Sequence, residues 1–180
     1  MRPAAELLDS TTSSAANMAK QRGLSLKALM DEIYAVADGF DSWKDAVTGF
    51  EGHPVGWKYI YSLIGVDADI RNGGIYQLHH NSTWHLILDA ADGAKAFGLK
   101  DLHKNLKDIL FYYHRIGRSK MRKRIPAGYF DDLSPKWNKS LAKLEDEYYR
   151  CFERRHWNDG INDLIKVVVQ SNPELVGQPL

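Results

Sequence analysis

Hydrophobic residues recur along this chain at the spacing of an α-helix, and no stretch shows the sustained alternation of a half-buried β-strand. In the clearest case, apolar side chains lie three, four, seven and eleven positions after the first and share one helical face: Leu26, Leu29, Met30, Ile33 and Ala37. Ser25 is suited to cap this helix, and Gly39 is suited to end it. The first strong pattern therefore predicts an amphipathic helix.

The same periodicity predicts further helices along the chain. Their apolar faces lie within residues 43–50, 57–64, 84–94, 102–113, 137–151 and 161–168. In the fourth face along the chain, Trp84, Ile87, Leu88, Ala91 and Ala94 are expected to face the core, with Gly93 admitting a close neighbour. The run Val167–Val169 has the composition of a strand, but a single strand would have no partner, so a helix is favoured.

Glycine and proline mark the expected helix boundaries. Asp41 is expected to start the short second helix, and Gly65 is expected to end the third, leaving residues 66–82 irregular. Gly117 is expected to stop another helix, which makes residues 117–133 an exposed loop. Ser134 and Pro135 form an N-cap and first-turn pair for the helix that follows.

Together these segments predict an all-α fold, a single compact and irregular bundle of about seven helices. The length of 180 residues suits one domain, and 44% apolar residues supply a core. Residues 1–23, rich in Ala, Ser and Thr, are expected to be a flexible leader before a helical domain at 24–180. No apolar run approaches the roughly 20 residues of a membrane span. The single cysteine, Cys151, favours a reducing compartment, so a cytoplasmic protein is expected.

The segment at 72–82, which reads NGGIYQLHHNS, is the most distinctive part of the chain. Asn and Gly tolerate positive φ, so Asn-Gly-Gly predicts a sharp turn, and Gln, Asn and Ser then supply hydrogen bonds around a short helix. Six residues are therefore candidates either for a structural turn or for a groove that binds a partner: Asn72, Gly73, Gly74, Gln77, Asn81 and Ser82.

On these six residues the chain resembles a bacterial family of unknown function that includes a DNA-mimic protein. The family's segment reads Asn-Gly-Gly-aromatic-x-Gln-aromatic-aromatic-x-Asn-Ser; here Ile75, Leu78 and His79 replace the aromatic residues. The likeness continues through Gly93-Ala94 to Asn172-Pro173-Glu174. The resemblance implies an all-helical fold and binding to another protein, and it brings no catalytic residues.

A second candidate site is a run of six cations within ten residues that contain no acid: Arg115, Arg118, Lys120, Arg122, Lys123 and Arg124. Such a run is suited to bind phosphates or nucleic acid, although a solvated helix end explains it as well. Without these six the chain keeps 18 of its 24 basic residues against 23 acidic ones, so its charge is bipolar although its net charge is +1.

Nothing in the spacing of chemically reactive residues indicates catalysis. The chain has no P-loop, nucleophile elbow or dinucleotide fingerprint, and Cys151 lies on an expected core face, where a thiol is inert. Five histidines lie between residues 79 and 114, but none forms the i, i+4 pair of a helical zinc site. We therefore expect neither an enzyme nor a bound metal or cofactor.

The sequence thus favours a cytoplasmic protein-interaction domain, for which a regulatory role and a homodimer both stay open. A nucleic-acid-associated protein using residues 115–124 is the second hypothesis, and an unrecognised enzyme is the third. DNA mimicry itself is disfavoured, because a mimic needs dense negative charge and this chain is nearly neutral.

Overall fold

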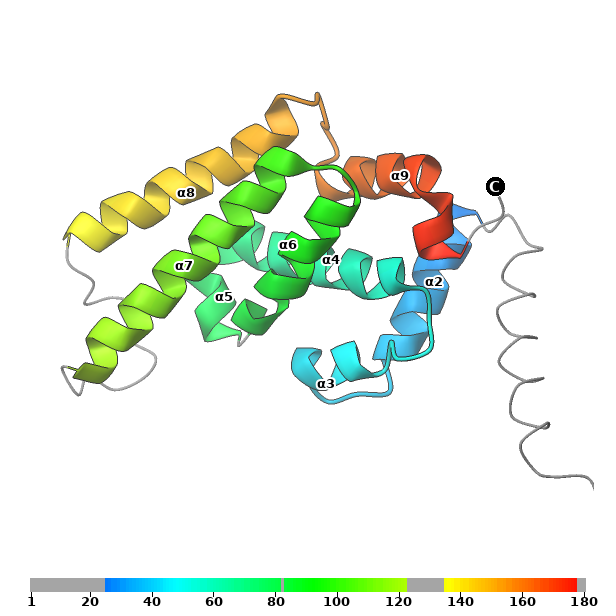
Figure 1. Ribbon diagram of the computed structural model, residues 1–180, viewed down its shortest axis with the longest axis horizontal. Helices are drawn as coiled ribbons and strands as arrows, with labels where there is room; N and C mark the ends of the chain where they lie inside the picture. Colours follow the sequence, from blue (N-terminus) through cyan, green and yellow to red (C-terminus); the bar gives the residue numbers. More distant parts are fainter. Residues whose placement is uncertain (1–24, 82, 123–134, 178–180) are drawn as a thin grey trace, which may run out of the picture.

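The computed structural model describes residues 25–81, 83–122 and 135–177, and every regular element within them is helical (Figure 1). The α-helices are α2 (Leu26–Ala37), α3 (Trp43–Thr48), α4 (Val55–Gly73), α5 (Gln77–His80), α6 (Leu86–Ala96), α7 (Lys100–Arg122), α8 (Pro135–Glu153) and α9 (Ile161–Ser171). Two 3-10 turns, η2 (Thr83–His85) and η3 (Pro173–Val176), complete the set. The predicted all-α fold is confirmed, and the expected leader at 1–23 lies outside the described residues.

Helix α4 is the centre of the bundle. It contacts α2, α3, α5, α6, α9 and both 3-10 turns, and Figure 1 shows it passing behind α6 with α9 and α2 near its amino-terminal half. Its consecutive residues Ile60, Tyr61, Ser62 and Leu63 are all buried, so this helix is enclosed on every side rather than along a single stripe. The other helices therefore pack around α4 and share one core.

The small residues of α6 let it lie close to α4. A Cβ atom added to Gly93 would be 2.6 Å from Cβ of Tyr59, and Ala90, Ala91 and Ala94 are fully buried beside it. The predicted close approach at Gly93 is confirmed. The predicted core positions of Trp84 and Leu88 are wrong. Trp84 lies in η2 and is 38% exposed, and Leu88 is 47% exposed because α6 turns Leu86 and Ile87 inward.

Several predicted boundaries hold, and three do not. Ser25 Oγ accepts from the Ala28 amide at 3.2 Å and caps α2, and residues 167–169 are helical within α9. The expected start at Asp41 is one residue early, because the Ser42 side chain caps α3. Gly65 does not end its helix: α4 continues to Gly73, since Val66 and Ile70 extend its buried face.

The third wrong boundary concerns the expected loop at 117–133. Helix α7 passes through Gly117 and ends at Arg122, and residues 123–134 lie outside the described part of the chain. Nothing between Gly117 and Arg122 breaks a helix, and Gly117 is not among the residues with positive φ. The first six residues of the predicted loop, 117–122, are therefore helical.

Helices α7 and α8 form an antiparallel pair that extends from the bundle. Arg155, just after α8, donates two hydrogen bonds of 2.6 and 2.5 Å to the Asp101 carboxylate at the start of α7. Further along, Asn105 Nδ2 donates to the Leu144 carbonyl at 2.9 Å. The opposite ends of both helices extend beyond α5 and α6 on the left of Figure 1.

The turn between α4 and α5 depends on one glycine. Gly74 has φ 72° and ψ −172°, a conformation that is almost confined to glycine, and its amide donates to the Ile70 carbonyl at 2.8 Å. A Cβ atom at this position would also lie 2.5 Å from Oε2 of Glu145 in α8. Gly73 differs, because it is the last helical residue of α4.

We expect Gly74→Ala to lower the free energy of unfolding by about 1–3 kcal/mol, because it adds backbone strain and displaces Glu145. Denaturant unfolding measures the change. Gly39→Ala is the matched control: a Cβ atom there meets nothing within 4 Å, so its effect should stay within about 0.5 kcal/mol. Equal stability of the two variants would show that the Gly74 conformation is not required.

Candidate functional site at the carboxyl end of α4

The polar residues of the Asn-Gly-Gly segment gather around a buried carboxylate of α4. Gln77 Nε2 donates to Asn81 Oδ1 at 3.0 Å, and Asn81 Nδ2 donates to Asp69 Oδ1 at 2.6 Å. The Thr83 hydroxyl donates to the other oxygen of Asp69, which is only 7% exposed. Asn72 is exposed on the last turn of α4, and Ser82 lies outside the described residues. The structure thus brings Gln77 and Asn81 together in intramolecular contacts, and a partner groove at this segment stays a prediction.

Helix α8 holds the same turn from the other side. Glu145 Oε2 accepts from the Ile75 amide at 3.1 Å, and the Tyr76 hydroxyl donates to Asn138 Oδ1 at 2.6 Å. The Tyr149 hydroxyl donates to the Ile70 carbonyl at 3.0 Å, so this carbonyl near the end of α4 accepts from α8 as well as from the Gly74 amide. Local sequence patterns do not link Glu145 to Ile75, because the two residues are seventy positions apart.

A second carboxylate of α4, Asp67, lies on the α8 side of the helix and is 2% exposed. Tyr148 donates to its Oδ1 at 2.8 Å, and Arg71 Nε is 3.0 and 2.8 Å from its two oxygens. Burial raises the pKa of the Asp67 carboxyl, although both donors act to lower it. Burial, with the nearby carboxylate, also holds the pKa of Tyr148 well above its usual value, so Tyr148 stays a donor.

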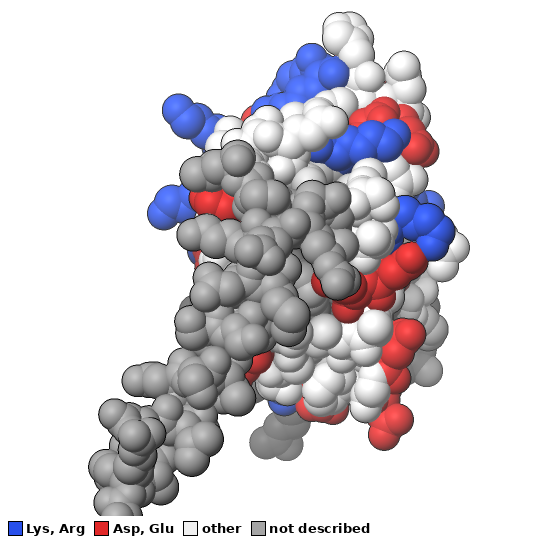
Figure 2. Space-filling view, turned by 90° about the vertical axis from the view of Figure 1, so that its right-hand side faces the viewer, with Lys and Arg blue, Asp and Glu red and all other residues white. Residues whose placement is uncertain are grey.

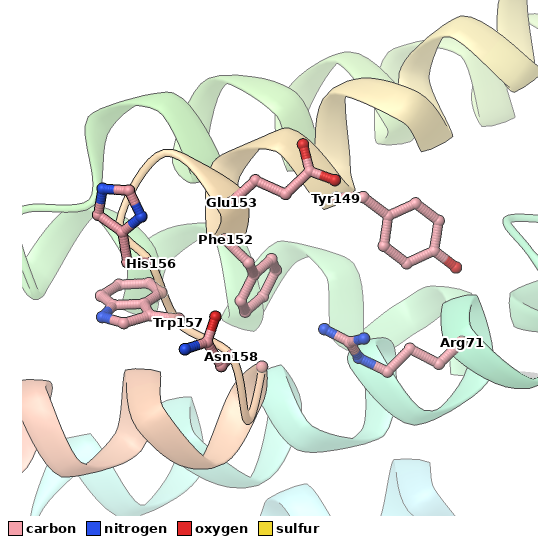
Figure 3. A pocket seen from close by; sticks show the side chains of 8 residues that line it. Arg71, Tyr149, Phe152, Glu153, His156, Trp157 and Asn158 are labelled. Carbon is pink, nitrogen blue, oxygen red and sulfur yellow. The ribbon is translucent and has the colours of Figure 1, made fainter.

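A cavity of about 410 Å³ opens beside Arg71. Figure 3 shows its walls: Arg71 from α4, then Tyr149, Phe152 and Glu153 from the end of α8, then the segment 156–160 that leads into α9. Within that segment, His156 has a positive φ of 54°, which is uncommon for a residue other than glycine. Arg71 and residues 149–160, which are far apart in sequence, therefore meet at one concave site.

The Arg71 guanidinium is fixed in this cavity by contacts on several sides. Its carbon Cζ lies 5.7 Å from the ring centre of Tyr149 and 5.4 Å from that of Phe152. Gly160 has φ 56°, and a Cβ atom there would lie 2.5 Å from an Arg71 terminal nitrogen. Glycine at this position therefore permits both the turn and the close approach of the guanidinium. Sequence reasoning missed this site, since no local spacing links Arg71, Glu153 and Gly160.

The basic run lies far from this cavity, at the free end of α7. Arg115, Arg118, Lys120 and Arg122 belong to the last turns of that helix, whereas Lys123 and Arg124 lie outside the described residues. Arg115 is exposed, and its guanidinium lies 5.5 Å from the ring centre of Phe111, which is 54% exposed. A basic and partly aromatic helix end replaces the expected basic loop.

The described cysteine and histidines do not form a reactive cluster. Cys151 is buried, and burial raises the pKa of its thiol to about 11, so the thiol stays protonated at neutral pH. Nδ1 of His103 lies 2.7 Å from the Ala91 carbonyl, in a contact between α7 and α6. Within the described residues, no group of three or more His, Cys, Asp or Glu side chains is placed to hold a metal ion.

None of the helices in the described part of the chain is both long and apolar enough to cross a membrane. Among curated proteins and solved structures, no match to the chain was found. A family model described as DMP19-like protein matches residues 51–171, about two thirds of the chain. That segment contains α4, the Asn-Gly-Gly turn, α8 and the whole cavity. The chain therefore belongs to the DMP19-like protein family.

Proposed function

We propose that this protein is a non-catalytic, cytoplasmic interaction domain that binds a partner protein through the acidic surface of α2 and α3. The observation that carries the proposal is a set of six exposed carboxylates in and around these two helices: Asp31, Glu32, Asp38, Asp41, Asp45 and Glu51. Lys27 and Lys44 are the basic residues of the same segment, and Lys27 pairs with Asp31 at 2.6 Å. The remaining carboxylates keep a net negative surface.

Exposed aromatic side chains lie among these carboxylates. Tyr34 is 38% exposed and Phe40 is 40% exposed, on and just after α2. Figure 2 shows acidic side chains predominating in the lower half of the face that it presents, the half in which α2 and α3 lie in Figure 1. Aromatic residues supply contact area and carboxylates supply steering, so this surface is suited to a protein that presents lysine and arginine.

The charge is separated along the longest axis of the molecule. The acidic surface of α2 and α3 lies toward one end, and the basic end of α7 lies at the other (Figure 1). The family that the sequence resembles includes a DNA mimic, and the α2–α3 surface has the negative charge that mimicry needs. Helices α2 and α3 precede the matched segment 51–171, so the proposed role of this surface rests on its charge.

The test compares two variants that each remove two carboxylates. Asp38→Asn with Asp41→Asn alters the proposed surface, and Asp92→Asn with Asp146→Asn is the matched control, with exposed carboxylates elsewhere. After a pull-down from source cells has identified the partner, stopped-flow binding should show an association rate lowered several-fold by the first variant only. High salt should reduce this difference. Equal rates for the two variants would place the interface elsewhere.

The basic end of α7 supports a second candidate function, binding to nucleic acid. Two features oppose this function. The rest of the molecule is acidic and repels a phosphate backbone, and a nucleic-acid strand needs a basic surface that is longer than one helix end.

We therefore expect the native chain not to bind a generic DNA duplex or single strand, even at low salt. Fluorescence anisotropy with labelled oligonucleotides measures this. The variant Arg122→Glu, Lys123→Glu, Arg124→Glu should keep the helical fold and give the same null result. Salt-sensitive binding by the native chain that disappears in the triple variant would favour the nucleic-acid function instead.

A further inference from the structure

Two arginines beside the end of α8 use their guanidinium groups differently. Both terminal nitrogens of Arg155 donate to Asp101, and Nη1 also donates to the Cys151 carbonyl at 2.8 Å. Arg71 bonds its carboxylate, Asp67, through Nε alone. No acceptor among the described residues bonds the terminal nitrogens of Arg71, which line the cavity (Figure 3). Arg71 therefore presents a fork of free donors to whatever enters.

The orientation of this fork is set before any ligand arrives. Asp67 holds Nε, the rings of Tyr149 and Phe152 flank the guanidinium, and the Gly160 backbone lies against one terminal nitrogen. A planar guanidinium matches a carboxylate in a bidentate pair, and a fixed one loses little freedom on binding. The geometry thus favours a carboxylate as the group bound by Arg71.

The lining of the cavity also includes a carboxylate. Glu153, at the end of α8, is exposed, lines the cavity and pairs with no cation of the described residues. Glu153 and the nearby Asp67 give the site two negative charges, and Arg71 gives it one positive charge. A phosphate or another dianion would be repelled, whereas a ligand with both a carboxylate and an ammonium group would match both signs of charge.

The remaining walls indicate an apolar body. Tyr149, Phe152 and Trp157 supply aromatic rings, and the volume of about 410 Å³ is in the range of sites for small molecules. We propose that this cavity binds a free α-amino acid with an aromatic or other apolar side chain, its carboxylate on Arg71 and its ammonium on Glu153. The site is separate from the α2–α3 surface, and the inference does not depend on the proposed partner protein.

Calorimetric titration of the intact chain with L-phenylalanine tests this site. N-acetyl-L-phenylalanine lacks the ammonium group, and L-phenylalaninamide lacks the carboxylate. We expect saturable binding of phenylalanine and affinities at least about tenfold weaker for both derivatives, because each leaves one charged wall without a partner. No saturable binding of phenylalanine, or equal affinity for a derivative, would overturn the proposal.

Variants assign the two ends of the ligand. Glu153→Gln should leave folding unchanged, since this side chain is exposed and unpaired, and should weaken phenylalanine about tenfold without weakening the N-acetyl derivative. Glu174→Gln, an exposed control outside the cavity, should change neither affinity. Arg71→Gln should abolish the preference for phenylalanine over its amide, and its unfolding curve is measured in parallel because Asp67 loses a partner. Unchanged phenylalanine affinity in Glu153→Gln would contradict the assignment.

Discussion

The buried carboxylate of Asp67 determines how α8 and Arg71 are placed around the carboxyl end of α4. A charge that is 2% exposed is stable in a helical core only with donors close to it, and here Tyr148 and Arg71 supply them. The hydrogen bond to Asp67 sets the position of α8 against α4, because the Tyr148 hydroxyl of α8 must lie within bonding distance of the carboxylate on α4. Asp67 also fixes Arg71 at the surface, where the rings of α8 flank it. The cavity beside Arg71 is thus a consequence of how one buried charge is stabilised.

Asp69, two residues further along α4, is a second buried carboxylate that binds neighbouring elements, on another side of the helix. Two positions in a helix point about 200° apart, so Asp67 serves α8 while Asp69 accepts from Asn81 and Thr83 near α5 and η2. Between the two networks, the Gly74 turn leaves the Ile75 amide for Glu145. The distinctive sequence segment therefore ends the central helix and ties it to two neighbours, while its exposed residue, Asn72, faces solvent.

Local periodicity was sufficient to predict the helices, because the apolar residues of each amphipathic face are only three or four positions apart in sequence. It failed where burial outweighs a local signal: Gly65 lies inside α4 because Val66 and Ile70 continue the core, and Gly117 lies inside α7. Local patterns do not reveal the donors to Asp67 and Asp69, since Tyr148 lies 81 positions from Asp67 and Asn81 lies twelve positions from Asp69. The cavity was not predictable at all, because Arg71, Glu153 and Gly160 meet only after α4, α8 and α9 have packed.

The hydrogen bond between Tyr148 and the charged Asp67 holds α8 on α4, and a double-mutant cycle measures its contribution. The unfolding free energies of the native chain, Tyr148→Phe, Asp67→Asn and the double variant are measured by denaturant titration. Loss of the hydroxyl should cost about 1.5–3 kcal/mol beside Asp67 and at least about 1 kcal/mol less beside the neutral amide. The same cost in both backgrounds would contradict this role of the hydrogen bond.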